Sequence, residues 1–482
     1  MFNVLQDELA TAHIILPPIN SEGAHLATAS SQPDPVALPR DRRIHLLALA
    51  AIIFFTTCGG AFGLEPLIGA VGPALSLVFI LVTPLLWSLP TALMVAELTA
   101  LLPEEGGFYI WVRESFGPIW AVQQACWTMT ISVIWLAMYP ILFVGYLSFL
   151  IPALSAPAHP FLRWIITVVM IASGLLLNLR GSHNVGNAAQ IVTAFVLGAF
   201  VVMLIAWLAR MHNPGALPGI LHRDLLTPHP GALLLGISYT VFNYSSWDSV
   251  STYAGEVDQP QRNYPRAIAY ALLLTVICYL VPVSAGVTVT TDASVWSSDQ
   301  GWPVIARLIA GRWLGTLMAI GGLASIWGLF NGQLLYVSRL PYVLARDGWL
   351  PKLFAKTSDT AAPRAALIAF CGLTALFTAF SLGSLAIIQC VLYCAALTLD
   401  FLALLILRAK YPKQGLTFRV PGGSAGLAYV CIAPFIFASF VMYAALRDWR
   451  SYPGQLLVIP CVAVAGALLY FLRRNRSIAQ NQ

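Results

Sequence analysis

The segment from Phe242 to Glu256 constrains this chain most, because it places an acid and a run of polar residues inside an otherwise apolar stretch. Residues 231–241 before it are hydrophobic, and its middle reads Ser-Ser-Trp-Asp-Ser-Val-Ser, with the acid at Asp248. A carboxylate near the middle of a bilayer costs about 2.5–3.5 kcal/mol on insertion scales. Irregular backbone at that depth survives only where it is buried in protein or lines a cavity. We therefore expect an interrupted helix with a small-molecule site at this segment.

The rest of the chain has the composition of a polytopic membrane protein. Hydrophobic residues make up 59% of its 482 residues and charged residues only 10%. A helix needs about 20 apolar residues to cross a bilayer. This criterion predicts an all-α integral membrane protein with twelve transmembrane helices in the lipid bilayer. Their expected ranges are 43–71, 74–101, 117–152, 161–179, 188–210, 231–255, 264–290, 313–346, 364–382, 384–409, 424–446 and 453–472.

The basic residues predict the orientation of these spans. With the N-terminus inside, most of the 26 Lys and Arg residues fall on the cytoplasmic side, so we expect both termini in the cytoplasm and the chain in the plasma (inner) membrane. The same bias accounts for the net charge of +6, so no nucleic-acid partner is expected. Residues 1–39 are expected to form a disordered cytoplasmic tail, residues 40–475 the membrane domain, and residues 476–482 a cytoplasmic C-terminal tail.

Several functional classes lack sequence support. The eight cysteines lie in or at the edges of predicted spans without CxxC spacing, so we expect no metal site and no disulfide framework. The loop at 151–162 contains no cysteine, which argues against a disulfide-linked partner chain. No GxxxxGK[ST] loop is present, so ATP-driven pumping has no support, and we expect no cofactor. A membrane-embedded enzyme is disfavoured because no nucleophile–base spacing appears.

A second interrupted span is expected near the N-terminus. Gly59, Gly60 and Gly63 release the backbone from helical geometry. Pro66 stands where a new helix would begin, since proline is tolerated in a first turn. The interrupted spans are the first and the sixth, and matched interruptions point to a transporter site. They predict an inverted five-plus-five repeat at about 43–210 and 231–409, followed by extra spans at about 424–472.

Four stretches combine glycines, acids and aromatics in a specific way. They contain Gly-Gly-Ala-Phe-Gly-Leu-Glu at 59–65, Leu-Pro-Glu-Glu-Gly-Gly-Phe-Tyr within 96–117, Trp-Asp-Ser-Val-Ser-Thr within 244–265, and Ala-Arg-Asp-Gly-Trp-Leu-Pro within 328–351. Together they resemble the amino acid–polyamine–organocation superfamily, and the first and third are most similar to its polyamine uptake branch. The resemblance implies the leucine-transporter fold and proton-driven uptake.

Two carboxylates are expected to select the substrate. Glu65 falls in the first turn of the second half-helix of span one, where unpaired N–H groups create a partial positive charge. In amino acid carriers of this fold those N–H groups hold the substrate carboxylate, which Glu65 would replace and repel. Asp248 adds a second anion, so the pair suits a di- or polyamine. Because neighbouring carboxylates repel in a low dielectric, one or both would take up a proton in the empty site.

Structural alternatives stand beside these roles. Glu65 is alternatively a helix cap without ligand contact, and Asp248 caps the broken helix or pairs with an arginine. The remaining expected substrate-binding residues fall into two groups. Some offer backbone or hydroxyl groups at the breaks. The others are aromatic residues whose rings either stack on a cation or pack in the core. They are Gly59, Gly60, Gly63 and Ser246, and Phe62, Trp135, Tyr139 and Trp247.

Five further residues are expected to act in gating or proton coupling: Glu97, Arg113, Tyr244, Glu256 and Asp400. Glu97 and Glu256 lie toward the cytoplasmic ends of spans two and six, near Arg113 and Arg262, where an ion-pair network or simple surface acids are both possible. Tyr244 is expected in an outer lid with Phe242. Asp400 is either a proton relay or a structural hydrogen-bond partner.

The sequence leaves the substrate and the coupling ion open. The resemblance leads us to expect a secondary active importer of polyamines or related organic cations; the alternative is a permease for cationic or neutral amino acids. A receptor or a non-transporting subunit is a third class. Many proton-dependent relatives carry a Lys in span five, whereas residues 188–206 contain none, so carboxylates would have to carry the protons. Sodium coupling is disfavoured, although Ser325 and Ser338 in span eight offer hydroxyls for it.

Overall fold

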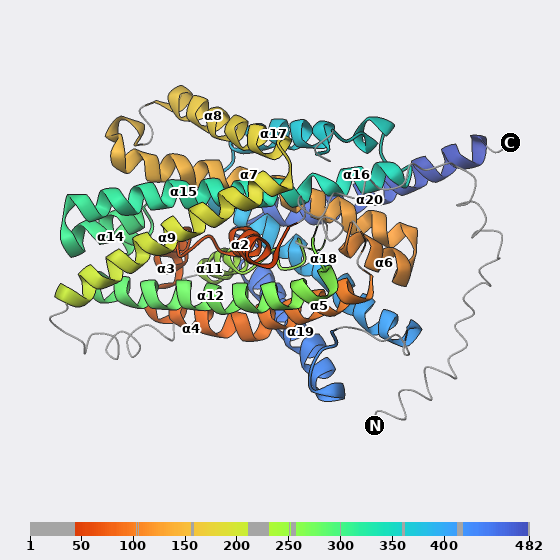
Figure 1. Cartoon of the computed structure of the whole chain (residues 1–482), viewed down its shortest axis with the longest axis horizontal. Helices are drawn as coiled ribbons and strands as arrows, with labels where there is room; N and C mark the ends of the chain where they lie inside the picture. The colour runs from red at the N-terminus through yellow and green to blue at the C-terminus, as the bar shows by residue number, and fades with distance from the viewer. Residues whose placement is uncertain are drawn as a thin grey trace. The chain divides into compact units, whose positions relative to one another are not determined.

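The computed structural model describes residues 44–102, 104, 106–155, 159–210, 231–249, 251, 257–298, 300–358, 362–411 and 418–480. Within them the chain is helical, apart from one isolated parallel bridge between Ile44 and Val257 (Figure 1). Nine helices in this described part are long and apolar enough to cross a membrane. The all-α membrane class is therefore confirmed, whereas the twelve spans and the inverted repeat stay predictions. The expected tail at 1–39 and Glu256 lie outside the described residues.

The first half of the described chain contains α2 (Leu46–Thr57), α3 (Glu65–Val71), α4 (Pro73–Thr83), a π-helical turn (Pro84–Ser88), α5 (Leu89–Leu101), α6 (Phe108–Phe116), α7 (Pro118–Leu150), α8 (Pro160–Leu179), α9 (Ser182–Arg210) and α11 (Ala232–Asn243). The second half contains α12 (Pro260–Val289), α13 (Ala293–Trp296), α14 (Gly301–Ala310), α15 (Arg312–Val337), α16 (Arg339–Arg346), α17 (Arg364–Phe377), α18 (Leu382–Lys410), α19 (Gly423–Arg447) and α20 (Pro453–Gln480). The last helix extends beyond the span expected to end at residue 472.

The first interruption lies between α2 and α3. Three glycines there have positive φ angles: 64° at Gly59, 91° at Gly60 and 91° at Gly63. Residues with a side chain rarely adopt positive φ angles, so glycine is the residue that can turn the chain here. Pro66 follows in the first turn of α3. The chain therefore leaves one half-helix and begins the next within seven residues, 58–64.

The second interruption follows α11, which ends at Asn243. Ser246 has a φ of 72°, one of two positive values among the described residues other than glycine. A positive φ at serine costs energy that its surroundings must offset. The local contacts of Ser246 therefore hold this turn, and they are described with the site below.

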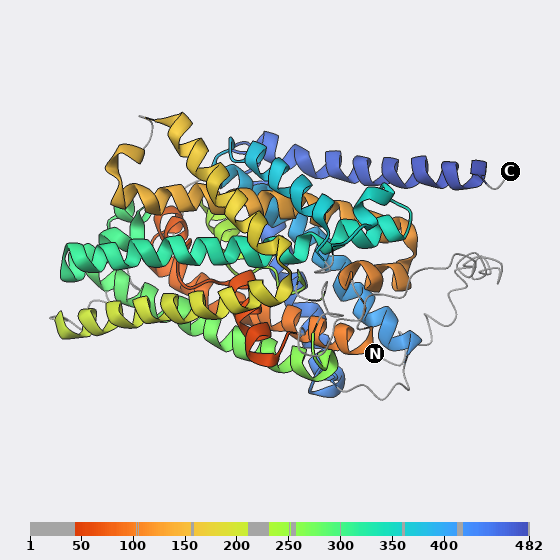
Figure 2. The ribbon, with the colours of Figure 1, turned by 45° about the horizontal axis from the view of Figure 1, so that its top comes forward.

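The buried share of each helix distinguishes the central helices of the bundle from the peripheral ones. In the most apolar stretch, 72% of α18 and 67% of α7 is buried, against 6% of α20, which runs along the edge of the bundle (Figure 2). α15 contacts α7, α9, α14 and α2. In Figure 1, α6 and α16 lie at one end of the bundle, and α3 and α14 lie at the opposite end.

The tight first interruption generates a test of stability. A Cβ atom at Gly59 would lie 2.7 Å from Cγ of Leu329. Gly59→Ala adds this clash to a left-handed conformation, at about 1–2 kcal/mol for the conformation alone. We expect a clearly lower unfolding temperature for Gly59→Ala in detergent. Gly198→Ala is the matched control, because a Cβ at Gly198 meets nothing within 4 Å; equal melting of both variants would contradict the account of the break.

Candidate functional site

The carboxylate of Glu65 closes the first interruption. Its Oε2 atom accepts a hydrogen bond of 2.7 Å from the backbone N–H of Gly63, and its Oε1 atom accepts one of 2.6 Å from the hydroxyl of Tyr146. The backbone N–H of Trp302, in α14, donates to the same Oε1 at 3.3 Å. Glu65 is 3% exposed. The acid therefore occupies one backbone donor of the first interruption, one backbone donor of α14 and the hydroxyl of Tyr146.

Three carbonyl groups of the first interruption accept hydrogen bonds from neutral side chains. Their partners come from three different helices: Ser325 Oγ of α15 donates to Gly59 O, Trp302 Nε1 of α14 to Ala61 O at 2.8 Å, and Asn243 Nδ2 of α11 to Gly63 O at 3.1 Å. Neutral donors leave the negative ends of these dipoles without a compensating charge. The break is thus rich in partial negative charge, to which Glu65 adds its carboxyl group.

Asp248 has a tyrosine partner rather than an arginine. Its Oδ1 atom accepts a hydrogen bond of 2.6 Å from the hydroxyl of Tyr393 on α18. The same hydroxyl accepts a bond of 2.9 Å from the N–H of Ser246, which fixes the turn with positive φ. Asp248 is 4% exposed. Both expected substrate acids are therefore buried, and each is held by the hydroxyl of a tyrosine.

Two polar side chains tie the interruptions together. Gln333 of α15 donates to Thr56 O at 2.8 Å and to Ser246 Oγ at 2.7 Å. Tyr279 of α12 donates to Asn243 O at 2.6 Å. The hydroxyl of Tyr279 also lies 3.5 Å from Thr57 O, so both side chains contact residues of both broken spans and are placed to couple them.

The expected aromatic residues gather around the two tyrosines. The Phe62 ring lies 5.4 Å from Tyr146 and 4.8 Å from Phe200. The Trp135 ring lies 5.2 Å from Tyr393. Phe62 thus belongs to the surroundings of Glu65, and Trp135 to those of Asp248.

The expected aromatic residues also make hydrogen bonds and ring contacts away from Tyr146 and Tyr393. Trp135 Nε1 donates to Gln389 at 2.9 Å, and Trp247 Nε1 donates to Tyr244 O at 3.1 Å. Tyr139 packs on Phe242 with centroids 5.8 Å apart. Tyr244, expected in an outer lid, is fully buried and donates to Ile80 O at 2.9 Å, so it joins α11 to α4.

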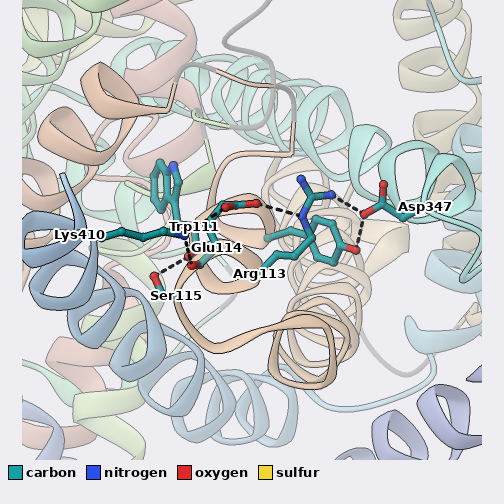
Figure 3. Close-up of polar contacts among 7 residues, drawn as sticks. Trp111, Arg113, Glu114, Ser115, Asp347 and Lys410 are labelled. Atoms are coloured by element: carbon teal, nitrogen blue, oxygen red, sulfur yellow. Dashed lines mark hydrogen bonds and ion pairs between the residues drawn. The ribbon is translucent and has the colours of Figure 1, made fainter. Parts of the chain in front are cut away.

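At the end of the bundle that carries α6, ion pairs join three helices (Figure 3). Arg113 Nη1 donates to Asp347 Oδ2 at 2.7 Å, and the Tyr109 hydroxyl donates to the same atom at 2.6 Å. Glu114 lies 3.5 Å from Lys410 Nζ and 3.7 Å from Arg113 Nε. Burial and the charge of Asp347 raise the pKa of Tyr109, so its hydroxyl remains a donor. We call Tyr109, Arg113, Glu114, Asp347 and Lys410 the α6 network.

Glu97 pairs with Arg408 and not with Arg113, which was expected near it. It forms a bidentate pair with Arg408 of α18, with Nη2 at 2.6 Å from Oε2, and it accepts from Val420 N at 2.7 Å. Arg113 binds Asp347 instead. The ion pairs expected at this end are present, but they connect α5 with α18 and α6 with α16. The sequence could not assign these partners, because several acids and bases lie at this end of the spans.

The α6 network generates a test of closure. Asp347→Asn removes the charge that holds Arg113 and Tyr109; for a partly exposed pair this is worth about 1 kcal/mol, or about fivefold in an opening equilibrium. In a variant whose sole cysteine is Cys58, which is buried at the first break, we expect faster labelling by a water-soluble thiol reagent. Asp292→Asn, in a loop whose acid caps α13, is the control and should leave the rate unchanged. An unaltered rate in Asp347→Asn would rule out a closing role.

Comparison with known proteins places these features in a family. Residues 44–464 match the family model described as amino acid permease. The chain is 32% identical over 456 residues to polyamine transporter RMV1 of Arabidopsis thaliana, covering 91% of this chain and 90% of that protein. It is 33% identical over 436 residues to polyamine transporter PUT1 of Oryza sativa subsp. japonica, covering 90% of this chain and 80% of that protein. The resemblance expected from the motifs is thereby confirmed: the chain belongs to the amino acid permease family, whose members are membrane transporters rather than enzymes.

Proposed function

We propose that this protein imports polyamines or related organic cations across the plasma membrane by proton symport, through alternating access of a central site. One observation carries the proposal: the Glu65 carboxylate already accepts the Gly63 N–H at 2.7 Å. An amino acid substrate needs such a donor for its own carboxylate. A polyamine has no carboxylate and does not need this donor, so a polyamine can bind while Glu65 occupies the Gly63 N–H.

The second buried acid supports the same substrate class. Asp248 and Glu65 lie at different helix breaks, and each has a tyrosine hydroxyl at 2.6 Å. A carboxylate binds an ammonium group more strongly than it binds a neutral hydroxyl. Two acids at separate positions therefore suit a flexible chain with an ammonium group at each end. Similarity to proteins named polyamine transporters supports this substrate.

The proposed architecture is a twelve-span inverted repeat with both termini in the cytoplasm. The broken helices α2–α3 and α11 stand at matching places in the two expected halves. Under this proposal the α6 network closes the cytoplasmic side, and α14 covers the first break from outside through Trp302. Proton binding to the carboxylates of the site supplies the coupling.

An amino acid permease is the second candidate, and the description of the family model favours it. In that case the Glu65 carboxylate would have to leave the Gly63 N–H when the substrate carboxylate enters. Movement of one buried acid away from three donors has a substantial cost, because each hydrogen bond to a charged group is worth about 1.5–3 kcal/mol.

Uptake by purified protein in liposomes distinguishes these functions. We expect labelled spermidine to accumulate under a proton gradient without sodium, and a protonophore to abolish the accumulation. Unlabelled putrescine should compete, whereas leucine and arginine should not. Competition by leucine would favour the amino acid permease, and accumulation that requires sodium and ignores the protonophore would contradict proton symport.

A substitution at Asp248 tests the site itself. Asp248→Asn removes the charge with little change in shape, and the loss of a charge-assisted bond of about 1.5–3 kcal/mol should lower spermidine uptake at least tenfold. Asp448→Asn is the matched control, because Asp448 is also buried but accepts from Leu234 N at 3.1 Å, away from both breaks. Normal affinity in a folded Asp248→Asn protein would remove Asp248 from the site.

A further inference from the structure

The buried pair of Asp400 and Gln124 contains an acceptor without a donor. Gln124 Nε2 lies 3.2 Å from both carboxyl oxygens of Asp400. The two residues are 0% and 1% exposed, respectively. The Oε1 atom of Gln124 is buried and has no hydrogen-bond partner within the described part of the chain. A buried amide oxygen left in this way costs about 1–3 kcal/mol, and the neighbouring acid is the group placed to satisfy it.

Among the described residues, no Lys or Arg forms an ion pair with Asp400. α5, α6, α7, α11, α19 and α20 pack against α18. Titratable groups on these helices include Glu97, Tyr109, Arg113, Glu114, Cys126, Tyr239 and Cys431. Glu97 is paired with Arg408, and Arg113, Glu114 and Tyr109 belong to the α6 network. Among the described hydrogen bonds and ion pairs, Asp400 has Gln124 alone.

An ionised carboxylate that is buried without a cation carries a desolvation penalty of several kcal/mol. A single neutral amide donor, shared between two oxygens, offsets only a small part of it. The neutral acid is therefore the form that these surroundings favour.

We propose that Asp400 is held as a neutral acid in a reciprocal hydrogen-bonded pair with Gln124, and that it is a proton-binding site of the transport cycle. In this pair the carboxyl O–H donates to Gln124 Oε1, while Gln124 Nε2 donates to the other carboxyl oxygen. Nε2 lies 3.2 Å from both oxygens in the described structure, and the pair forms when the amide turns so that Nε2 faces one oxygen and Oε1 the other. Every polar atom of the pair then has a partner.

The position of Asp400 links it to the substrate site. Tyr393, which holds Asp248, lies seven residues earlier on α18. Seven residues are two helical turns, or about 10 Å along the axis. Asp400 and Tyr393 thus share one buried face of α18, and Asp400 is nearer to the end that carries the α6 network. Loss of its proton to water at that end would leave a carboxylate that still accepts from Gln124. This second part of the proposal rests on the proposed function; the acid–amide pair does not.

Infrared difference spectroscopy of the purified protein at neutral pH tests the pair. Asp400→Asn should remove a carbonyl band of a protonated carboxylic acid, because asparagine replaces the acid with a neutral group of the same shape. Gln124→Leu should shift that band, since it removes the hydrogen-bond partner. Asp448→Asn should leave it unchanged. Loss of a carboxylate band instead, in Asp400→Asn, would show that Asp400 is ionised and would overturn the pair.

Transport by the same variant tests the proton-binding role. Asp400→Asn should lower proton-driven accumulation of spermidine at least tenfold, while exchange of spermidine across liposomes without a gradient stays within twofold of wild type. Wild-type accumulation in Asp400→Asn would overturn the role. If the wild-type protein itself shows no proton-driven uptake, the proposed function fails, and the infrared result still decides the acid–amide pair.

Discussion

The hydrogen bond from the Gly63 N–H to the Glu65 carboxylate is the contact on which the centre of this structure depends. The chain turns at Gly59, Gly60 and Gly63, and each turn frees backbone groups that an apolar interior cannot leave unpaired. Glu65 satisfies the donor side, and side chains from α11, α14 and α15 satisfy the carbonyl side. Removing the acid would leave the N–H of Gly63 without its charged acceptor. Under the proposed function, the contact that stabilises the break also decides what the break can bind.

Contacts in the described structure link the helices on either side of the breaks, and we propose that they close the site. Trp302 of α14 binds Ala61 O and the Glu65 carboxylate, and a Cβ at the neighbouring Gly301 would lie 2.5 Å from Cγ of Glu65. At the other end the α6 network joins α16 and α18. In the proposed cycle these closures open in turn. Gln333, which contacts both breaks, is placed to couple them.

Local signals in the sequence agree with the glycine turns between α2 and α3 and with the end of α11 at Asn243. Three glycines followed by an acid and a proline within an apolar span indicate a break in the helix. A polar run around Asp248 cannot face lipid. The partners of these acids could not be predicted. Tyr146 and Tyr393 are two of 17 tyrosines, and nothing near them in the sequence separates them from core residues. Trp302 comes from a short helix between two spans, and its contact with Glu65 joins positions 237 residues apart.

The central claim is that Glu65 excludes a substrate carboxylate, and calorimetric binding of putrescine and ornithine tests it most directly. These two ligands have the same pair of ammonium groups and differ by one carboxylate. The account predicts that wild-type protein binds putrescine at least tenfold more tightly than ornithine, and that Glu65→Gln reduces this difference. Equal or tighter binding of ornithine by the wild-type protein would contradict the account.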